Sequence, residues 1–316
     1  MLVQKTPTDN EATTKKEPYY FALKKSKRIK EFEKDKANSK DDSETKIVLE
    51  NEISFFEVRE LMISKRLSRS PHKNIINFLD FKVLENETWI LMEYMPINLL
   101  EFYGRNKKNP NVMNERFFKN IAYQILSGIK HLHSEQIIHR DIKLENILCD
   151  EKNNIVKIGD FGLGRLIDYN SETEYTTELG TLPYKPPEVL LGLKQYSTGF
   201  DIWSTGCVLV LICTMKYLFG AHDPVGVLKY MYEIFGSFND DLLPGYRDFP
   251  NGNLVANLPE KEGIGLVEFI NQKKKFEFEN DNFYNLIKKM LFINPNKRIN
   301  AEGCLSHPWF SNIDVI

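Results

Sequence analysis

Two short polar motifs separated by an apolar run constrain this chain more than any other feature of its sequence. The first motif reads H-R-D-I-K-L-E-N over residues 139–146, and the second reads D-F-G over residues 160–162. The run I-V-K-I-G at residues 155–159 has the apolar character of a short strand that leads into the second motif. Either motif alone is best explained as a surface ion pair or a turn, but both motifs in this order indicate a functional site.

The residue types in these motifs suit the transfer of a phosphoryl group. Its transition state is loose and spreads negative charge over the phosphate oxygens, so a protein must mainly position groups and neutralise charge. The motifs resemble the catalytic core of protein kinases. The resemblance implies ATP and Mg²⁺ as cofactors, with Asp141 orienting the acceptor hydroxyl and Lys143 beside the transferred phosphate. It also implies Asn146 and Asp160 as the metal ligands, because magnesium prefers hard oxygen donors.

The composition is that of a globular chain of about two domains or lobes. It has 316 residues, of which 42% are hydrophobic and 27% are charged. The formal net charge of -2 predicts neither nucleic acid nor an acidic membrane as the main partner. The four cysteines show no C-x-x-C pairing and residues 1–20 lack a signal-peptide pattern, so we expect a reducing, intracellular location in the cytoplasm and nucleus. The longest apolar run, at residues 207–214, is too short to span a bilayer and predicts a buried helix.

Residues 19–24 read Y-Y-F-A-L-K, a run typical of a half-buried strand. The kinase resemblance implies that Ala22 lies over the adenine and that Lys24 pairs with the α- and β-phosphates. The family's glycine-rich loop, which lets backbone N–H groups approach phosphates closely, should precede this strand, but no glycine occurs before Gly104. Residues 2–5 are predicted to be the remainder of the second strand. Two explanations stay open: a truncated start, or a kinase that works without the loop.

The next part of the chain is predicted to be an insertion followed by a helix. Residues 26–46 interleave basic and acidic side chains with almost no large apolar ones, which predicts a solvated insertion and not a binding site. Residues 47–67 have apolar residues at helical spacing and no proline. By resemblance, this is the mobile helix of the small lobe.

That helix should carry the glutamate that forms an ion pair with Lys24. Residues 54–60 read S-F-F-E-V-R-E and are similar to P-S-T-A-I-R-E of the cyclin-dependent kinases, which makes Glu60 the expected partner and Glu57 the alternative. The Glu60 register places polar Ser64 where the family packs an apolar residue, which counts against it.

Residues 88–95 form a strand-like run that resembles the kinase hinge. The resemblance implies Met92 as the gatekeeper and the backbone of Glu93 and Met95 as the groups that hold the adenine edge. Leu148, just after the catalytic motif, would form the floor under the adenine. These assignments come from the resemblance alone, because backbone contacts leave no side-chain signature.

The larger C-terminal part is predicted to be helical. Residues 117–133 have the apolar spacing of a long buried helix. By resemblance, Asp201 would hold the backbone of the catalytic loop, and Arg298 would pair with Glu188 in a scaffold role.

The segment between D-F-G and P-P-E, which ends at Glu188, resembles a kinase activation segment. Thr176 lies where cyclin-dependent kinases carry their activating threonine. A phosphate there needs forked cationic donors, and Arg59, Arg140 and Arg165 occupy the three places from which the family supplies them.

Two departures from the family bear on the substrate. Cyclin-dependent and mitogen-activated kinases usually have valine or alanine in a strained backbone where this chain has Gly180, and arginine where it has Lys185. A glycine that relaxes would leave its carbonyl free, so we expect a substrate residue with an N–H to be accepted better than proline. Together with the missing loop, this resembles the single-subunit kinases that phosphorylate the activation-loop threonine of cyclin-dependent kinases.

The sequence thus predicts an α+β, two-lobed protein kinase fold with ATP and magnesium in the cleft. Residues 1–95 form a small β-rich lobe without its first strand and glycine loop, and residues 96–316 form a larger helical lobe. Lys143 favours transfer to serine or threonine of a protein substrate, which includes the option of another kinase.

Two alternatives to a self-sufficient kinase stay open. One is a cyclin-dependent kinase that needs a cyclin-like regulator. The aromatic residues Phe55 and Phe56 replace smaller ones on the helix face that would meet a cyclin, which counts against this alternative, but exposed aromatic residues can also bind partners. The other is a pseudokinase scaffold, which the missing loop favours and the retained motif residues oppose.

Overall fold

The computed structural model describes residues 2–4, 20–27, 55–84, 87–109, 112–167, 180–274, 281–311 and 313. The chain divides into two compact units. The first unit contains Met1–Ser70 and Asn77–Tyr94, and the second contains Pro71–Ile76 and Met95–Ile316. The predicted insertion, apart from its first residues, and the predicted helix start at residues 47–54 lie outside the described residues.

The first unit is built on an antiparallel sheet. Its strands are β1 (Leu2–Gln4), β2 (Tyr20–Lys27), β3 (Phe78–Val83) and β4 (Glu87–Glu93), in the spatial order β1-β2-β4-β3. Strand β2 includes Ser26 and Lys27, which the charge pattern assigned to the insertion, so this boundary of the prediction was wrong. Cross-strand neighbours explain the difference, because Lys25 stacks over the Trp89 ring and lies 3.8 Å from Glu87.

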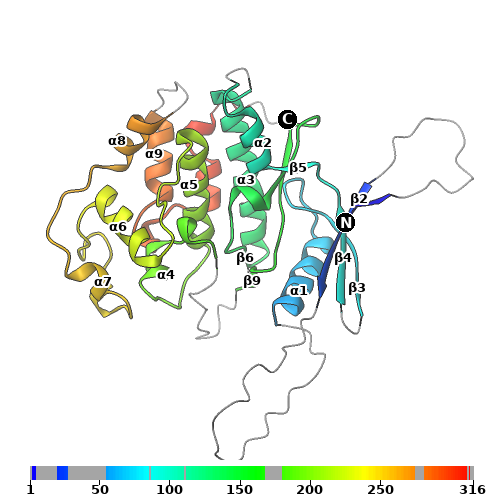
Figure 1. Ribbon diagram of the computed structural model, residues 1–316, viewed down its shortest axis with the longest axis horizontal. Helices are drawn as coiled ribbons and strands as arrows, with labels where there is room; N and C mark the ends of the chain where they lie inside the picture. The colour runs from blue at the N-terminus through cyan, green and yellow to red at the C-terminus, as the bar shows by residue number, and fades with distance from the viewer. Residues whose placement is uncertain are drawn as a thin grey trace, which may run out of the picture. The chain divides into compact units, whose positions relative to one another are not determined.

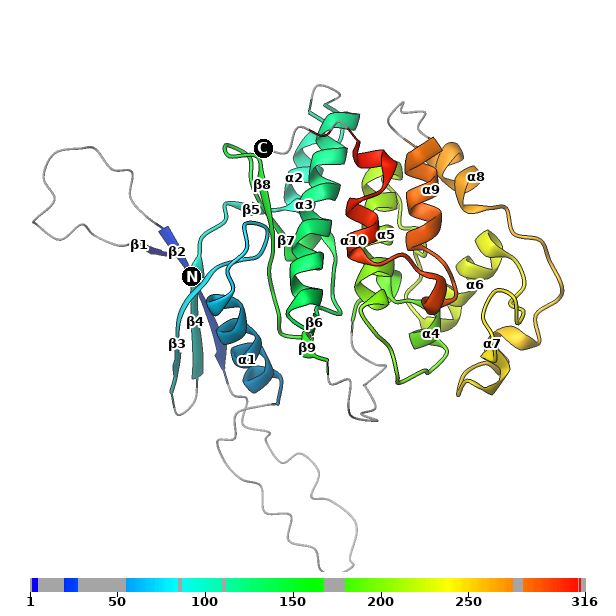
Figure 2. The same ribbon diagram turned by 180° about the vertical axis from the view of Figure 1, so that it is seen from behind.

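One helix, α1 (Phe55–Arg69), lies alongside this sheet (Figures 1 and 2). It packs on β3, and its buried residues Ile63 and Leu67 are four apart and therefore share a helix face.

The second unit is mainly helical, and α5 is its centre. This helix is buried along nearly its whole length. Figure 2 shows the short helix α10 beside the long helix α3. The helices of this unit are α2 (Leu99–Asn106), α3 (Glu115–Ser134), α4 (Pro187–Leu190), α5 (Gly199–Thr214), α6 (Pro224–Phe235), α7 (Asn253–Ala256), α8 (Leu266–Lys273), α9 (Asp281–Met290) and α10 (Ala301–Leu305).

Two small sheets hold the loops that carry the sequence motifs. Strands β5 (Ile97–Asn98), β7 (Ile147–Asp150) and β8 (Ile155–Ile158) form one sheet in the order β5-β7-β8. Strand β6 (Ile137–Ile138) pairs with β9 (Arg165–Leu166) in the other. The first motif lies between β6 and β7, and the second follows β8 directly. Across the described residues, no helix has both the length and the apolar character needed to cross a bilayer.

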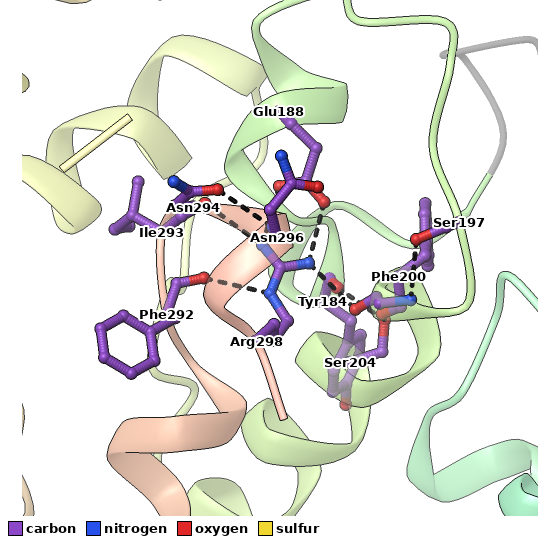
Figure 3. A network of polar contacts seen from close by, with 11 residues as sticks. Tyr184, Glu188, Ser197, Phe200, Ser204, Phe292, Ile293, Asn294, Asn296 and Arg298 are labelled. Carbon is purple, nitrogen blue, oxygen red and sulfur yellow. Dashed lines mark hydrogen bonds and ion pairs between the residues drawn. The ribbon is translucent and has the colours of Figure 1, made fainter. Parts of the chain in front are cut away.

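A buried ion pair joins α4 to the segment before α10 (Figure 3). Arg298 donates from Nη1 to one carboxylate oxygen of Glu188 at 2.8 Å and from Nη2 to the other at 2.9 Å. Its remaining donors reach the carbonyl oxygens of Gly199, Phe292 and Ile293. All five N–H groups of the guanidinium are therefore used, which is the arrangement that makes a buried charge tolerable.

Candidate active site

The Asp141 carboxylate lies at the centre of a compact polar cluster in the second unit. Its Oδ1 accepts a hydrogen bond of 2.7 Å from Thr181 Oγ1. Its Oδ2 lies 2.7 Å from Lys143 Nζ and accepts a hydrogen bond of 2.9 Å from Asn146 Nδ2. Lys143 Nζ also donates to Thr181 Oγ1 at 3.0 Å. Asp141 is 8% exposed, so a charge-assisted network in a largely dry site holds this carboxylate in one orientation.

The loop that carries Asp141 is tied to the core helix α5 by Asp201. The fully buried Asp201 carboxylate accepts hydrogen bonds of 2.9 Å from the backbone N–H groups of His139 and Arg140, and His133 Nε2 lies 3.0 Å away. Burial alone would raise the pKa of Asp201, but the hydrogen bond and charge of His133, with the contribution of His139, hold that pKa below its ordinary value. The carboxylate thus stays ionised and fixes the loop backbone.

The β7–β8 hairpin brings the two expected metal ligands to the same end. Ile147 pairs with Ile158. Asn146, just before β7, and Asp160, two residues after β8, therefore both lie at the open end of the hairpin. Asn146 Nδ2 donates to the backbone oxygen and the carboxylate of Asp141, and within the described residues no hydrogen bond involves its amide oxygen, a hard donor atom. Asp160 is exposed, with a φ of 57°. One amide oxygen and one exposed carboxylate fit a magnesium ion, which prefers such ligands.

The residue after Asp160 anchors this end of the hairpin. Phe161 is fully buried, and its ring meets the His139 ring edge to face at 5.1 Å. His139 Nε2 also lies 2.9 Å from the backbone oxygen of Gly159. The two motifs are therefore locked to each other through His139.

In the first unit, two glutamates of α1 face β2. Lys24 Nζ lies 2.6 Å from Glu60 Oε1, the pair that the resemblance favours. Glu57, the alternative, accepts a hydrogen bond of 2.6 Å from Ser26 Oγ. Glu60 is buried, whereas Lys24 keeps over a third of its side chain exposed and available to a ligand.

The expected adenine-contacting residues fall in both units. In the first unit, Ala22 of β2 pairs directly with Met92 of β4, and Glu93 ends β4. In the second unit, Met95 follows just before β5, and Leu148 lies in β7. The partial burial of Leu148 leaves part of its side chain accessible.

Among the expected regulatory residues, Arg140 has the most informative surroundings. It is 1% exposed, and its Nε donates to the Leu163 oxygen at 2.7 Å while its Nη1 donates to the Tyr196 hydroxyl at 3.0 Å. Its Nη2 has no hydrogen-bond partner within the described residues. Arg59 lies on α1 and Arg165 in β9. Thr176 lies outside the described residues.

The segment before α4 contains a site residue that the sequence analysis did not predict. Thr181 contacts both Asp141 and Lys143, yet no role was predicted for it. The available signal was its place in G-T-L-P-Y, just before the recognised P-P-E. Gly180 has a φ of 92°, a left-handed backbone that glycine adopts at little cost, and the expected preference against proline in the substrate stays a prediction.

Comparisons with known proteins agree with this geometry. A family model described as the protein kinase domain matches residues 11–310. Cyclin-dependent kinase 1 of Encephalitozoon cuniculi (strain GB-M1) is 33% identical over 274 residues, which cover 86% of this chain and 88% of the relative. Cyclin-dependent kinase B2-1 of Oryza sativa subsp. japonica is 30% identical over 262 residues, which cover 81% and 77%.

A solved structure extends the comparison to the fold. One chain in the crystal structure of the yeast RNA Pol II CTD kinase CTDK-1 complex superimposes with a TM-score of 0.75 at 24% identity, covering 93% of this chain and 86% of that chain. This likeness confirms the predicted α+β kinase fold, with a β-rich small part and a larger helical part. The family match and the sequence relatives lead to one conclusion: the chain belongs to the protein kinase family, as a cyclin-dependent-kinase-like serine/threonine kinase.

Proposed function

We propose that this chain transfers the γ-phosphoryl group of ATP to a serine or threonine hydroxyl of a protein, with Asp141 as the residue that receives or orients the hydroxyl proton. The observation that carries the proposal is the Asp141 carboxylate held by Thr181, Lys143 and Asn146. A carboxylate fixed in this way can accept a proton without reorganising, which is the role that phosphoryl transfer asks of it.

The other residues complete the proposed site. Lys143 places a positive charge beside Asp141, where negative charge develops on the transferred group. Lys24, aligned by Glu60, binds the α- and β-phosphates. Asn146 and Asp160 hold Mg²⁺, which neutralises phosphate charge when it is bound. Ala22, Met92, Glu93, Met95 and Leu148 are the residues proposed to contact the adenine.

Asp141→Asn and Asp160→Asn test this proposal directly. We expect each substitution to lower kcat for a protein substrate by about 10²- to 10⁴-fold, the usual loss when a general base or charge-stabilising group is removed. Thermal unfolding of each variant should confirm that it is folded, and Asp241→Asn, at an exposed aspartate, is the matched control. A wild-type chain that binds ATP but transfers no phosphate would instead support the pseudokinase scaffold.

A requirement for a protein partner is the second candidate, and an apolar surface on α1 favours it. Phe56, Val58 and Met62 are exposed by 47%, 40% and 54%. Val58 and Met62 are four apart and share a face of α1, where exposed apolar side chains suit contact with a partner. Activity of the purified chain alone on a cyclin-dependent kinase substrate would favour a self-sufficient activating kinase, whereas activity that appears only with an added cyclin would favour the partner-dependent one.

Phosphorylation of Thr176 is proposed to switch the enzyme on. Arg140 supports this, since its guanidinium is buried with an Nη2 group that lacks a hydrogen-bond partner in the described part of the chain. A phosphate is the ligand that such a forked cation binds best. We expect Thr176→Ala to lower kcat at least tenfold relative to the phosphorylated wild type, with mass spectrometry reporting the phosphate. Equal activity of the two proteins would reject the switch.

A further inference from the structure

Ser26 of β2 and Glu57 of α1 make a second polar contact between the strand and the helix that Lys24 and Glu60 already join. The Ser26 hydroxyl donates a hydrogen bond of 2.6 Å to Glu57 Oε1, the same length as the Lys24–Glu60 contact. Lys24 and Ser26 are two apart on a strand, so they point to the same face. Glu57 and Glu60 are three apart on a helix and also share a face. The two contacts are therefore neighbouring rungs between β2 and α1.

The two rungs differ in how strictly they fix the helix. Lys24 reaches Glu60 through a flexible four-carbon side chain, so that contact survives a small rotation or slide of α1. Ser26 has a single side-chain torsion before its hydroxyl, so its hydrogen bond to Glu57 tolerates a smaller shift of the helix than the contact made by the longer lysine side chain. The Ser26–Glu57 hydrogen bond therefore restricts the orientation of α1 more than the Lys24–Glu60 contact does.

Two buried hydroxyl groups of the first unit interrupt the apolar packing of α1 and β4. Ser64 on the helix and Thr88 on β4 are both 2% exposed, and their hydroxyl oxygens have no hydrogen-bond partner among the described residues. Thr88 is also the cross-strand neighbour of Ser26. A buried hydroxyl without a partner costs free energy, so Ser64 makes the burial of α1 less favourable than an apolar residue at this position would. The polar contacts Ser26–Glu57 and Lys24–Glu60 then contribute more to fixing the orientation of α1.

We propose that Ser26 and Glu57 are positioning residues for phosphoryl transfer, because their hydrogen bond sets the rotation of α1 at which Glu60 meets Lys24. This inference rests on the proposed function of Lys24 and Glu60 in nucleotide binding. It assigns a role to Ser26, which composition alone placed in a solvated insertion.

The test compares Ser26→Ala, Glu57→Ala and the double variant in the full chain. Three quantities are measured: kcat and KM for ATP, hydrogen exchange of the α1 amides, and Tm. We expect each single variant to lose about 3- to 30-fold in kcat and the double variant to lose no more than the worse single one, as for residues that act through one contact. Exchange of the α1 amides should quicken while Tm stays near that of the control.

Ser68→Ala is the matched control, since Ser68 lies on the same helix but is exposed and, among the described residues, its hydroxyl donates only to the Lys65 oxygen. Ser26→Thr keeps the hydroxyl and should recover most of the activity. The inference is overturned if the variants match Ser68→Ala in rate and exchange, if the losses multiply in the double variant, or if kcat falls only in step with Tm. If the wild type transfers no phosphate, the proposed function fails, and exchange alone decides whether the rung orients α1.

Discussion

Arg140, Asp160 and Gly180 all have a left-handed backbone, with φ values of 65°, 57° and 92°. Only glycine adopts this region at little cost, so the surroundings of the other two must hold them there. Arg140 is held by the bonds of its backbone and guanidinium, and Asp160 by the buried Phe161 that follows it. Backbone strain thus occurs in both sequence motifs, where the proposed chemistry takes place.

Gly180 offers a test at the scale of one residue. A Cβ atom added there would lie 2.9 Å from the Arg140 carbonyl oxygen, in addition to the cost of a left-handed backbone. We expect Gly180→Ala to lower the free energy of unfolding by about 1 to 2 kcal/mol. The kcat should fall further than this loss explains, because the neighbouring Thr181 contacts Asp141.

Urea unfolding and initial rates measure the two effects. Gly104→Ala is the matched control, because Gly104 lies in α2 with open space around its Cβ position, where alanine should stabilise the helix by up to about 1 kcal/mol. A Gly180→Ala protein as stable and active as the wild type would show that this backbone is not constrained.

The sequence predicted some site residues and missed others for a physical reason. Asp141, Lys143 and Asn146 are close in the chain, so one motif contains all three. Thr181 reaches Asp141 across 40 residues, and its hydrogen bonds exist only once α4 and the catalytic loop have packed. A single threonine carries no spacing pattern, so only tertiary structure identifies it.

At the scale of elements, the Arg298–Glu188 ion pair is the contact most sensitive to change. Arg298→Leu would leave the Glu188 carboxylate buried without a counter-charge, and such a loss costs about 3 to 5 kcal/mol. Arg298→Lys should also destabilise, because an ammonium group cannot replace the forked donors. Chemical denaturation measures both effects.

The exposed pair of Arg247 and Asp240 supplies the comparison for this prediction. Arg247→Leu removes a contact of 3.3 Å between two largely exposed side chains and should cost less than about 1 kcal/mol. Equal decreases in the free energy of unfolding for Arg298→Leu and Arg247→Leu would contradict the prediction that the buried ion pair matters more.

Element boundaries show where pattern analysis works and where it stops. The long helix predicted at residues 117–133 is α3, Glu115–Ser134, because Asn114 caps it by accepting a hydrogen bond from the Phe117 N–H. Strand β2 continues further than predicted, since Lys25 finds its partners on a strand distant in sequence. Local periodicity thus finds elements, but partners from other strands decide where they end.

For the whole molecule, His72 makes stability depend on pH. Its pKa is lowered from 6.5 to about 4, first by burial and then by the charges of His131, Lys73 and Lys157. Between these two values the unfolded chain binds a proton that the folded chain does not, so the free energy of unfolding should fall as pH drops from 6.5 to about 4.

His72→Gln should make this dependence shallower, as measured by denaturation at a series of pH values. Part of the slope should remain, because burial also lowers the pKa of His307. His222→Gln, at an exposed histidine, should leave the slope as in the wild type. An unchanged slope in His72→Gln would contradict the prediction.

Residues 71–76, which include His72, make contacts that could not be predicted from the sequence. Residues 71–76 precede two strands of the first unit, yet they belong to the second. The Asn74 amide group donates hydrogen bonds of 2.9 Å to Gln124 and to the Val156 oxygen, and Ile75 bridges to Ile158. These partners are 50 residues or more away in the sequence, so no local sequence pattern predicts these contacts.

The hydrogen bonds of the Asp201 carboxylate affect how the catalytic loop unfolds on heating. Since it clamps two catalytic-loop amides to α5, the most deeply buried helix, the loop cannot fray while the core remains intact. Loss of the catalytic-loop geometry and loss of tertiary structure in the second unit should therefore coincide on heating.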